Sequence, residues 1–309
     1  MNTHTCLVVG ATGRTGRRVA ARLRLRGIPV RAASRSSQVH FDWSQPAGWD
    51  ALLHGIYAAY VVPPPVPGPV HAFAARAAAA GVRRLVLLSG RGADGWGGSE
   101  FGRNMVSAEE AVRGAPLEWT VLRASNFAQN FGEDVFHAPL LAGELALPAG
   151  DVPEPFVDVE DIADAAVAAL TERDRHVRQV YELSGPRPVR FAEAVELIVR
   201  ASGRTLTYRQ ITCDAYVAEL VGQGVSRHEA DEVAEMFALM AGGSVSETTG
   251  DLTTVLERAP RTLEEYVVRA AAAGVWNAPA VRRRPHPGRS RTASPHTHTR
   301  EDLRNPAHT

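Results

Sequence analysis

Short apolar runs alternate with stretches of helical periodicity over much of the chain. The runs that fit strands end at Val9 or cover Pro29–Ala33, Val39–Asp42, Ile56–Val62, Arg84–Ser89, Glu118–Arg123 and Val180–Leu183. The helical patterns between them end at Gly27, run from Pro69 to Gly81, cover Phe101–Arg113, and start at Asp158. Runs that are apolar throughout, such as 84–89, are typical of strands buried on both faces of a parallel sheet. The alternation predicts an α/β fold, a doubly wound parallel Rossmann sheet with right-handed crossovers.

After Asn126 the pattern becomes irregular and then mainly helical. We predict a Rossmann domain over residues 1–156, to which 157–184 return, and a smaller, mainly helical domain over 185–278. Asp158 is expected to cap a helix, Asp161 to be a structural partner, and Ser226 with Glu229 and Thr262 with Glu265 are spaced as capping boxes. Residues 279–309 are almost free of apolar side chains, so they cannot repay the entropy lost on ordering, and we expect a disordered tail.

Composition excludes several classes of function. The 34 basic and 34 acidic residues balance, so no overall field favours nucleic acid or an anionic membrane. No apolar run approaches the ~18 residues of a membrane span, and the first strand starts at once without room for a signal peptide, so we expect a cytoplasmic protein. Every basic residue is arginine, which excludes Schiff-base chemistry on lysine. Cys6 and Cys213 lack metal-type spacing, and we expect inert thiols and no metal site.

The opening strand leads directly into a glycine-rich turn. The sequence from Leu7 to Gly16 reads Leu-Val-Val-Gly-Ala-Thr-Gly-Arg-Thr-Gly, with a helical pattern behind it. Glycines at this spacing allow a sharp turn, a close approach to phosphates and tight packing of helix on strand, while the helix N-terminus offers N–H groups to an anion. The turn therefore predicts a binding site for the pyrophosphate of a nicotinamide dinucleotide.

Residues after the second strand favour NADP over NAD. NAD-binding proteins of this architecture carry an acidic residue ~20 positions past the glycines, where this chain has Ser34-Arg35-Ser36. A carboxylate there would repel a 2′-phosphate, whereas Arg35 can bind it with charge-assisted hydrogen bonds. Arg14 can add a second cation to that phosphate, and Asp42 suits either the adenine amino group or the cap of a turn.

Ser89 follows the fifth strand in the frame of the short-chain dehydrogenase/reductase family. In that family the serine faces a Tyr-x-x-x-Lys pair on the next helix, but here the two places hold Phe101 and Met105. Neither side chain can protonate an alkoxide, so ordinary interconversion of alcohol and ketone is disfavoured.

Seven segments together carry a more specific resemblance. They are Gly10–Gly16, Ala33–Ser36, Phe41–Trp43, Val61–Pro64, Leu87–Ser89, Trp119–Arg123 with the pairs Asn126-Phe127 and Asn130-Phe131, and Pro155–Val159. They resemble the NmrA-type atypical members of the family over residues 5–276, and the Ala-Ser-Arg-Ser and Phe-Asp-Trp segments are most similar to the festuclavine dehydrogenase-like branch. The resemblance implies NADPH-dependent reduction of iminium ions, quinones, cationic dyes or conjugated lactones. It also includes redox-sensing regulators that bind the cofactor without turnover.

The residues agree with that chemistry. An acceptor that is already cationic or polarised needs little help from a dedicated proton donor, because water can complete the protonation. We expect an NADPH-dependent reductase of an electron-poor C=C or C=N bond in a conjugated butenolide or enone, an iminium ion or a quinone, within secondary-metabolite or signal-molecule biosynthesis. The expected partner is this small molecule, with no nucleic acid or membrane, and the protein is expected to be a monomer or homodimer.

The site residues follow from the motifs and the resemblance. The expected catalytic residues are Ser89, Asn126 and Phe127, and the expected substrate contacts are Asn130, Phe131 and Phe156. The expected cofactor contacts are Gly10, Thr12, Gly13, Arg14, Thr15, Gly16, Ser34, Arg35, Asp42, Val62 and Pro63. The phenylalanines could instead be core, the asparagines helix caps and Ser89 a buried hydrogen-bonded serine, whereas Met236, Phe237 and Met240 fit helix core better than a substrate wall.

Two other functions remain open. The missing Tyr and Lys would suit a catalytically silent NADP(H) sensor that controls a partner protein, which would bind NADP⁺ and NADPH unequally. A plain alcohol dehydrogenase that relies on Ser89 alone is the third.

Overall fold

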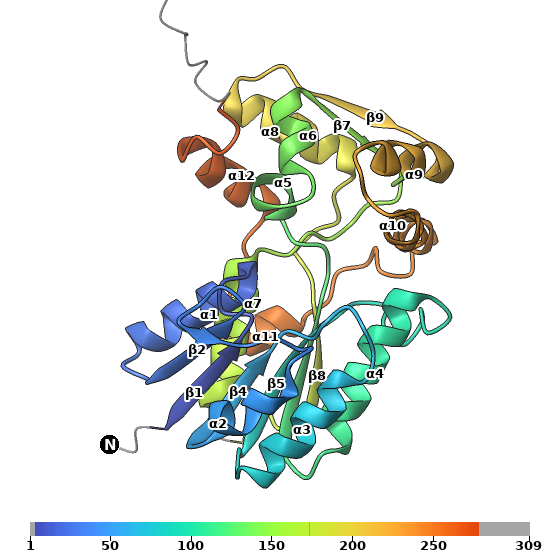
Figure 1. Cartoon of the computed structure of the whole chain (residues 1–309). Helices are drawn as coiled ribbons and strands as arrows, with labels where there is room; N and C mark the ends of the chain where they lie inside the picture. The colour runs from blue at the N-terminus through green and yellow to red at the C-terminus, as the bar shows by residue number, and fades with distance from the viewer. Residues whose placement is uncertain (1–3, 173, 278–309) are drawn as a thin grey trace, which may run out of the picture. The chain divides into compact units, whose positions relative to one another are not determined.

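Seven parallel strands form the central sheet of the structure, a computed structural model that describes residues 4–172 and 174–277. The strands are β1 (Thr5–Val9), β2 (Val30–Ser34), β3 (Val39–His40), β4 (Ile56–Val61), β5 (Arg84–Gly90), β6 (Glu118–Ala124) and β8 (Gln179–Leu183). Their order, β3-β2-β1-β4-β5-β6-β8, reverses between β1 and β4, as in a doubly wound sheet. The predicted fold class is confirmed (Figure 1), including the return of the chain to the sheet through β8. The predicted tail at 279–309 lies outside the described residues.

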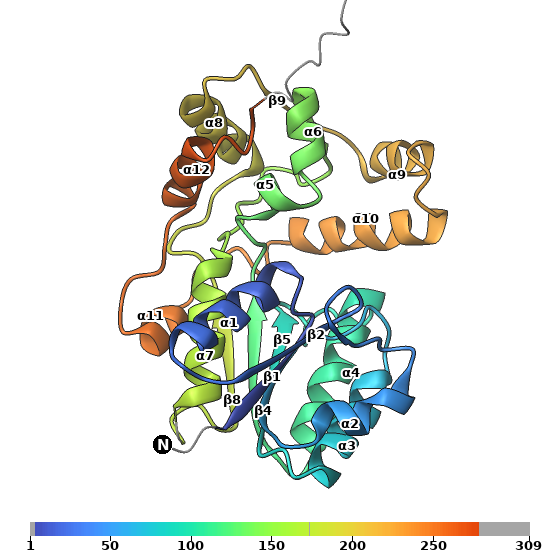
Figure 2. The ribbon, with the colours of Figure 1, turned by 60° about the vertical axis from the view of Figure 1, so that its left-hand side comes forward.

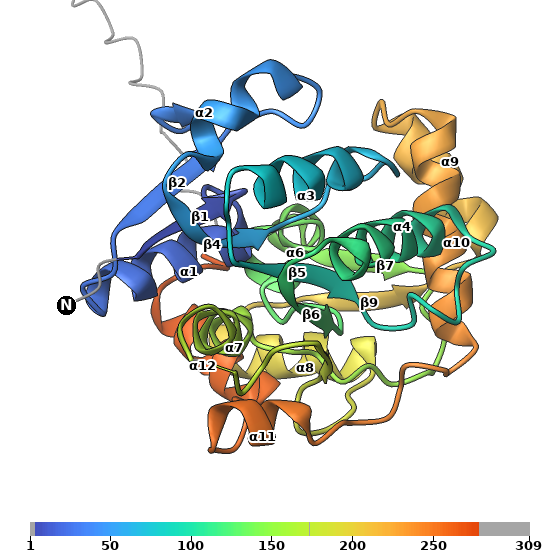
Figure 3. The same cartoon turned by 90° about the horizontal axis from the view of Figure 1, so that it is seen from below.

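Helices cover both faces of this sheet because successive side chains of each strand point to opposite sides. In β1, Cys6 and Val8 pack in one core while Leu7 and Val9 pack in another. The first core includes helices α1 (Arg14–Leu25), α7 (Val159–Thr171) and α11 (Asp251–Leu256); the second includes α2 (Trp49–Leu53), which follows the 3₁₀ turn η1 (Pro46–Gly48), with α3 (Pro69–Ala79) and α4 (Glu100–Gly114). Figure 2 shows α1, α7 and α11 on one face and α2, α3 and α4 on the other, and Figure 3 shows the layers from below.

A third core is built from the remaining elements. These are α5 (Asn130–Glu133), α6 (His137–Ala142), β7 (Glu144–Leu147), α8 (Phe191–Ser202), β9 (Thr207–Gln210), α9 (Cys213–Gly222), α10 (Arg227–Ala241) and α12 (Leu263–Ala272). β7 and β9 pair in parallel as a separate two-stranded sheet, which the sequence did not predict. The core already includes Ala128 and Ala149, ahead of the predicted limit at residue 156. The domain limits therefore stay a prediction.

The predicted helix starts are confirmed. Asp158 accepts a hydrogen bond from the N–H of Glu160 at 2.9 Å, and capping boxes close the first turns of α10 and α12. Asp161 is fully buried and binds Arg258 at 2.7 Å and the backbone N–H of Arg261 at 2.6 Å, which is the structural role expected for it. Across residues 4–172 and 174–277, no helix combines the length and apolarity that crossing a bilayer requires.

Candidate functional site

A groove of about 1,040 Å³ lies where the strand order reverses, at the carboxyl ends of β1 and β4. Ligands of open α/β sheets bind at this switch point. Ten of the eleven expected cofactor contacts line the groove: Gly10, Thr12, Gly13, Arg14, Thr15, Ser34, Arg35, Asp42, Val62 and Pro63. The eleventh, Gly16, is buried in the first turn of α1 and does not line the groove.

The glycine turn has the shape that a pyrophosphate requires. Gly10 has a φ of 77°, in the region that favours glycine, and a Cβ at Gly16 would lie 2.2 Å from the carbonyl oxygen of Gly10. Gly13 precedes α1 in extended conformation, and no described side chain caps the helix. The first-turn N–H groups of α1 are therefore available to an anion.

Hydroxyl groups and one arginine surround the other end of the groove. Thr12 donates to Ser34 at 3.1 Å, and Ser36 donates to Thr12 at 3.3 Å. Arg35 is exposed beside them, and its guanidinium has no hydrogen-bond or ion-pair partner in the described part of the chain. Asp42 accepts from the N–H of Ser44 at 2.8 Å and from its hydroxyl at 2.7 Å, and these bonds lower the pKa of Asp42. Asp42 therefore caps a turn, which is one of the two roles expected for it, the other being a contact with the adenine amino group.

Arg14 lines the groove, and its guanidinium is held by residues that follow β6. Its guanidinium donates to Asn130 Oδ1, pairs with Asp134 at 2.7 Å and lies 5.0 Å from the ring centroid of Phe127. These partners follow β6, whereas the residues around Arg35 follow β2. Arg14 therefore connects the cofactor turn to the neighbouring cavity, and its role as a second cation on a 2′-phosphate stays a prediction.

A second cavity, of about 360 Å³, adjoins the groove. The two share five lining residues: Arg14, Val62, Pro63, Leu88 and Phe127. Most of the remaining wall is apolar and comes from Trp96, Phe101, Met105, Val135, Met236, Met240 and Val245. Met236 and Met240 therefore belong to a cavity wall as well as to helix packing, contrary to expectation, while Phe237 is core. We call this space the acceptor cavity.

The structure brings four of the expected site residues to the acceptor cavity: Ser89, Asn126, Phe127 and Asn130. Phe127 lies on the shared wall, Asn126 directs its Nδ2 to the sulfur of Met240 at 3.4 Å, and Asn130 accepts from Arg14. Phe131 and Phe156 line neither cavity. Their rings are 5.1 Å apart in the third core and at most 2% exposed, so the expectation that they contact substrate is wrong. Apolar core and apolar pocket wall have the same sequence signature.

Ser89 lines the acceptor cavity, but its hydroxyl proton is already committed. Ser89 donates to Glu109 Oε1 at 2.7 Å, and this buried carboxylate also accepts two bonds of 2.8 Å from Arg123. Arg123 pairs further with Asp94 and Glu182, and hydrogen bonding to Glu109 raises its pKa. Ser89 is therefore the buried hydrogen-bonded serine of the alternative interpretation, and its proton is not free for a substrate.

Sequence reasoning missed Glu154. This residue lines the acceptor cavity, is only 3% exposed, and accepts the N–H of Asn126 at 3.3 Å. Burial raises the pKa of its carboxyl to about 7, against the lowering effects of the Asn126 hydrogen bond and of Arg91. The only signal in the sequence is an acidic residue between Pro153 and Pro155, directly before an apolar stretch.

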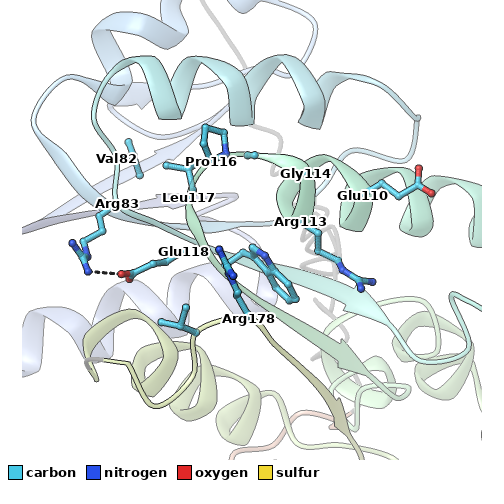
Figure 4. Close-up of a pocket in the computed structure, with 12 residues that line it drawn as sticks. Val82, Arg83, Glu110, Arg113, Gly114, Pro116, Leu117, Glu118 and Arg178 are labelled. Carbon is cyan, nitrogen blue, oxygen red and sulfur yellow. Dashed lines mark ion pairs between the residues drawn. The ribbon is translucent and has the colours of Figure 1, made fainter.

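A larger hollow, about 1,210 Å³, lies elsewhere (Figure 4). It is lined by residues at the starts of β5 and β6, among them Arg83 and Glu118, which form an ion pair at 2.5 Å. These are the amino ends of the strands, whereas ligands of such sheets bind at the carboxyl ends. This hollow is therefore not the dinucleotide site.

A doubly wound sheet with an uncapped glycine turn at its switch point defines a Rossmann-type dinucleotide-binding protein. The model of the NmrA-like family matches residues 73–267. The chain belongs to the NmrA-like family, as the resemblance predicted.

Relatives of the chain include reductases of small molecules. The chain is 30% identical to an NAD(P)H azoreductase of Xenophilus azovorans, over 86% of this chain and 98% of the relative. It is 35% identical to a (4-alkanoyl-5-oxo-2,5-dihydrofuran-3-yl)methyl phosphate reductase of Streptomyces griseus, over 68% of this chain and 78% of the relative. The structure of a Citrobacter triphenylmethane reductase complexed with NADP(H) aligns with 86% of this chain and 99% of its own, with a TM-score of 0.73 and 23% identity. This similarity establishes a shared fold.

Proposed function

We propose that this protein is an NADPH-dependent oxidoreductase that transfers a hydride to an electron-poor double bond of a small molecule. The observation that carries the proposal is the common wall of the two cavities, formed in part by Val62, Leu88 and Phe127. Hydride transfer requires donor and acceptor carbons held in contact, and adjoining cavities meet that requirement.

The residues of the groove fit NADPH. Gly10, Gly13 and the N-terminus of α1 would hold the pyrophosphate, and Arg35 with the hydroxyls of Ser34 and Ser36 would hold the 2′-phosphate. When bound, NADPH supplies a hydride from its nicotinamide ring. The chain's own contribution is to orient the two reactants across Phe127 and to exclude water with the apolar wall.

The acceptor cavity favours a conjugated butenolide or enone, an iminium ion or a quinone. Its volume of about 360 Å³ is within the range of small-molecule pockets. Phe101 and Met105 both line it and offer no acidic proton, and the proton of Ser89 is held by Glu109, so alcohol dehydrogenation is disfavoured. The azoreductase and the dihydrofuranone phosphate reductase support a reductase, and the second supports a place in secondary-metabolite or signal-molecule biosynthesis.

The test is acceptor-dependent loss of NADPH absorbance with menadione, a conjugated butenolide, a cyclic iminium ion and the malachite green cation. We expect turnover of at least one acceptor with NADPH preferred to NADH. Tight NADPH binding without oxidation by any of the four would refute the reductase and favour the silent sensor. In that case, titration should show unequal affinities for NADP⁺ and NADPH.

A further inference from the structure

Glu154 is an unusual carboxyl because it is buried, rigidly placed and unpaired. Its backbone forms both hydrogen bonds of a bridge to Val189, each 3.0 Å long, and its side chain lines the acceptor cavity. Oε1 accepts the N–H of Asn126, the side chain of Asn126 also lowers the pKa of the carboxyl, and no ion pair to Glu154 occurs among residues 4–172 and 174–277. Asn126 directly precedes Phe127, which lies on the wall shared with the cofactor groove. The carboxyl is therefore held in the wall of the acceptor cavity by the residue that precedes Phe127.

The charged groups around Glu154 do not neutralise it. Arg91, Arg14 and Asp134 are the other charged residues of the cavity wall. Arg91 binds Glu182 at 3.2 Å and donates to the hydroxyl of Ser125 and to the carbonyls of Val245 and Glu247. Its charge lowers the pKa of Glu154, but the two side chains form no ion pair. Arg14 and Asp134 pair with each other at 2.7 Å.

An unpaired carboxyl in an apolar wall favours the protonated form. This agrees with the pKa of Glu154, which burial raises to about 7 although Arg91 opposes the rise. A carboxylic acid with a pKa of about 7 can donate a proton near neutral pH, because the best donor has a pKa close to the working pH. The helix positions of Phe101 and Met105 carry no acid, and of the two carboxyl groups in the cavity wall, Asp134 is paired with Arg14 and Glu154 has no ion pair.

We propose that Glu154 is the proton donor of the acceptor cavity, and that the preferred acceptor is a neutral conjugated carbonyl compound or quinone rather than a preformed cation. The inference rests on the proposed function and adds the acceptor class. Hydride forms a C–H bond at the electrophilic carbon, and the π electrons of the conjugated bond move to the carbonyl oxygen. The O–H bond of Glu154 then breaks, its proton joins the resulting enolate or phenolate, and the carboxylate is reprotonated by water. One NADPH, one acceptor and one proton thus give NADP⁺ and the reduced acceptor.

A cationic acceptor requires no such proton, because hydride alone neutralises it. The two acceptor classes therefore separate the proton-donor role from a merely structural one. In the neutral class, kcat/KM should fall as the pH rises above about 7, because the donor loses its proton. With a cation, the ionised carboxylate attracts the substrate, so the rate should not fall over the same range.

The experiment compares Glu154→Gln and Glu154→Asp with the native protein, using menadione as the neutral probe and the malachite green cation as the charged one. Gln has the same shape and can still accept from Asn126, and NADPH titration checks that each variant is folded. Donor loss costs ~10²–10⁴-fold, so we expect at least a hundredfold lower kcat with menadione, a much smaller change with the dye, and loss of the pH dependence. Glu154→Asp should be slower than native but keep the pH dependence. Glu196→Gln, at a carboxylate on α8 that is 68% exposed, should change neither rate.

Each other outcome overturns the assignment. An equal loss with both probes shows that Glu154 acts through structure, and an unchanged rate or pH profile with menadione shows that the proton comes from elsewhere. If the native protein reduces the dye and not menadione, the acceptor class is wrong. If it binds NADPH and reduces neither probe nor the other acceptors, the proposed function itself fails.

Discussion

Replacing Arg35 with alanine tests the basis of cofactor choice. The guanidinium is exposed at the groove and has no partner in the part of the chain that the structure describes, so the replacement breaks no existing contact. A hydrogen bond to a charged group contributes about 1.5–3 kcal/mol, and exposure to water puts Arg35 near the lower limit. With 1.4 kcal/mol for each factor of ten, Arg35→Ala should weaken NADPH binding by about 10–30-fold. The hydroxyls of Thr12, Ser34 and Ser36 remain to bind the phosphate, which keeps the loss finite.

The assay is fluorescence titration of NADPH and NADH into both proteins at low and high salt. NADH lacks the 2′-phosphate, so its affinity should change by less than about twofold, and added salt should weaken NADPH binding more in the native protein than in Arg35→Ala. Arg24→Ala, which removes an exposed arginine at the far end of α1, is the matched control and should alter neither affinity. An equal loss for both nucleotides, or no loss for NADPH, would refute the assignment of Arg35 to the 2′-phosphate.

Three further replacements test the supporting structure. Gly16→Ala would place a Cβ 2.2 Å from the carbonyl oxygen of Gly10. We therefore expect urea denaturation to show a free energy of unfolding lower by about 1–3 kcal/mol, and NADPH binding to be weaker. If both quantities were unchanged, the tight packing at this turn would be contradicted. Glu109→Gln removes a buried ion-pair partner of Arg123. Because Arg123 keeps its other ion pairs, the free energy of unfolding should fall by an amount near the lower limit of the about 3–5 kcal/mol expected for breaking a buried pair. A fall below about 1 kcal/mol would show that this ion-pair network is dispensable for stability. The pKa of Glu154 is raised from 4.5 to about 7 in the folded protein. Its favourable contribution to the free energy of unfolding is therefore complete below pH 4.5 and is lost as the pH rises through 7. Above that pH the buried carboxylate lowers the free energy of unfolding by about 3 kcal/mol. Glu154→Gln should therefore be more stable than the native protein at about pH 8.5 and nearly equal at about pH 4, and an equal difference at both values would argue against this titration.

The main sheet could be predicted because its signals are local. Each strand from β1 to β6 coincides with a segment bounded by a turn or helix signal, and the structure places it within one or two residues of the predicted limits. α2 is only five residues long, and β7 and β9 are four residues each, too short to show a period. β7 is a strand because it pairs with β9, and its partner residues, such as Leu145 and Tyr208, are far apart along the chain.

The cofactor groove could be predicted from local signals alone. Gly10 and Gly13 lie in the turn after β1, and Gly16 lies in the first turn of α1. Ser34 and Arg35 lie at the end of β2, the neighbouring strand of a predictable sheet. The acceptor cavity, in contrast, depends on contacts between segments far apart along the chain. Its wall joins Phe127, Glu154 and Met240 from distant parts of the chain, and no local pattern marks residues that meet only after folding. For the same reason the sequence could not show that Phe131 and Phe156 lie in the core and not in the cavity wall. Core positions and pocket walls both favour apolar side chains, and only the packing of the folded chain distinguishes the two. The same reason applies to Glu154, whose proton affinity is set by the groups that surround it in the folded chain and not by its neighbours in sequence.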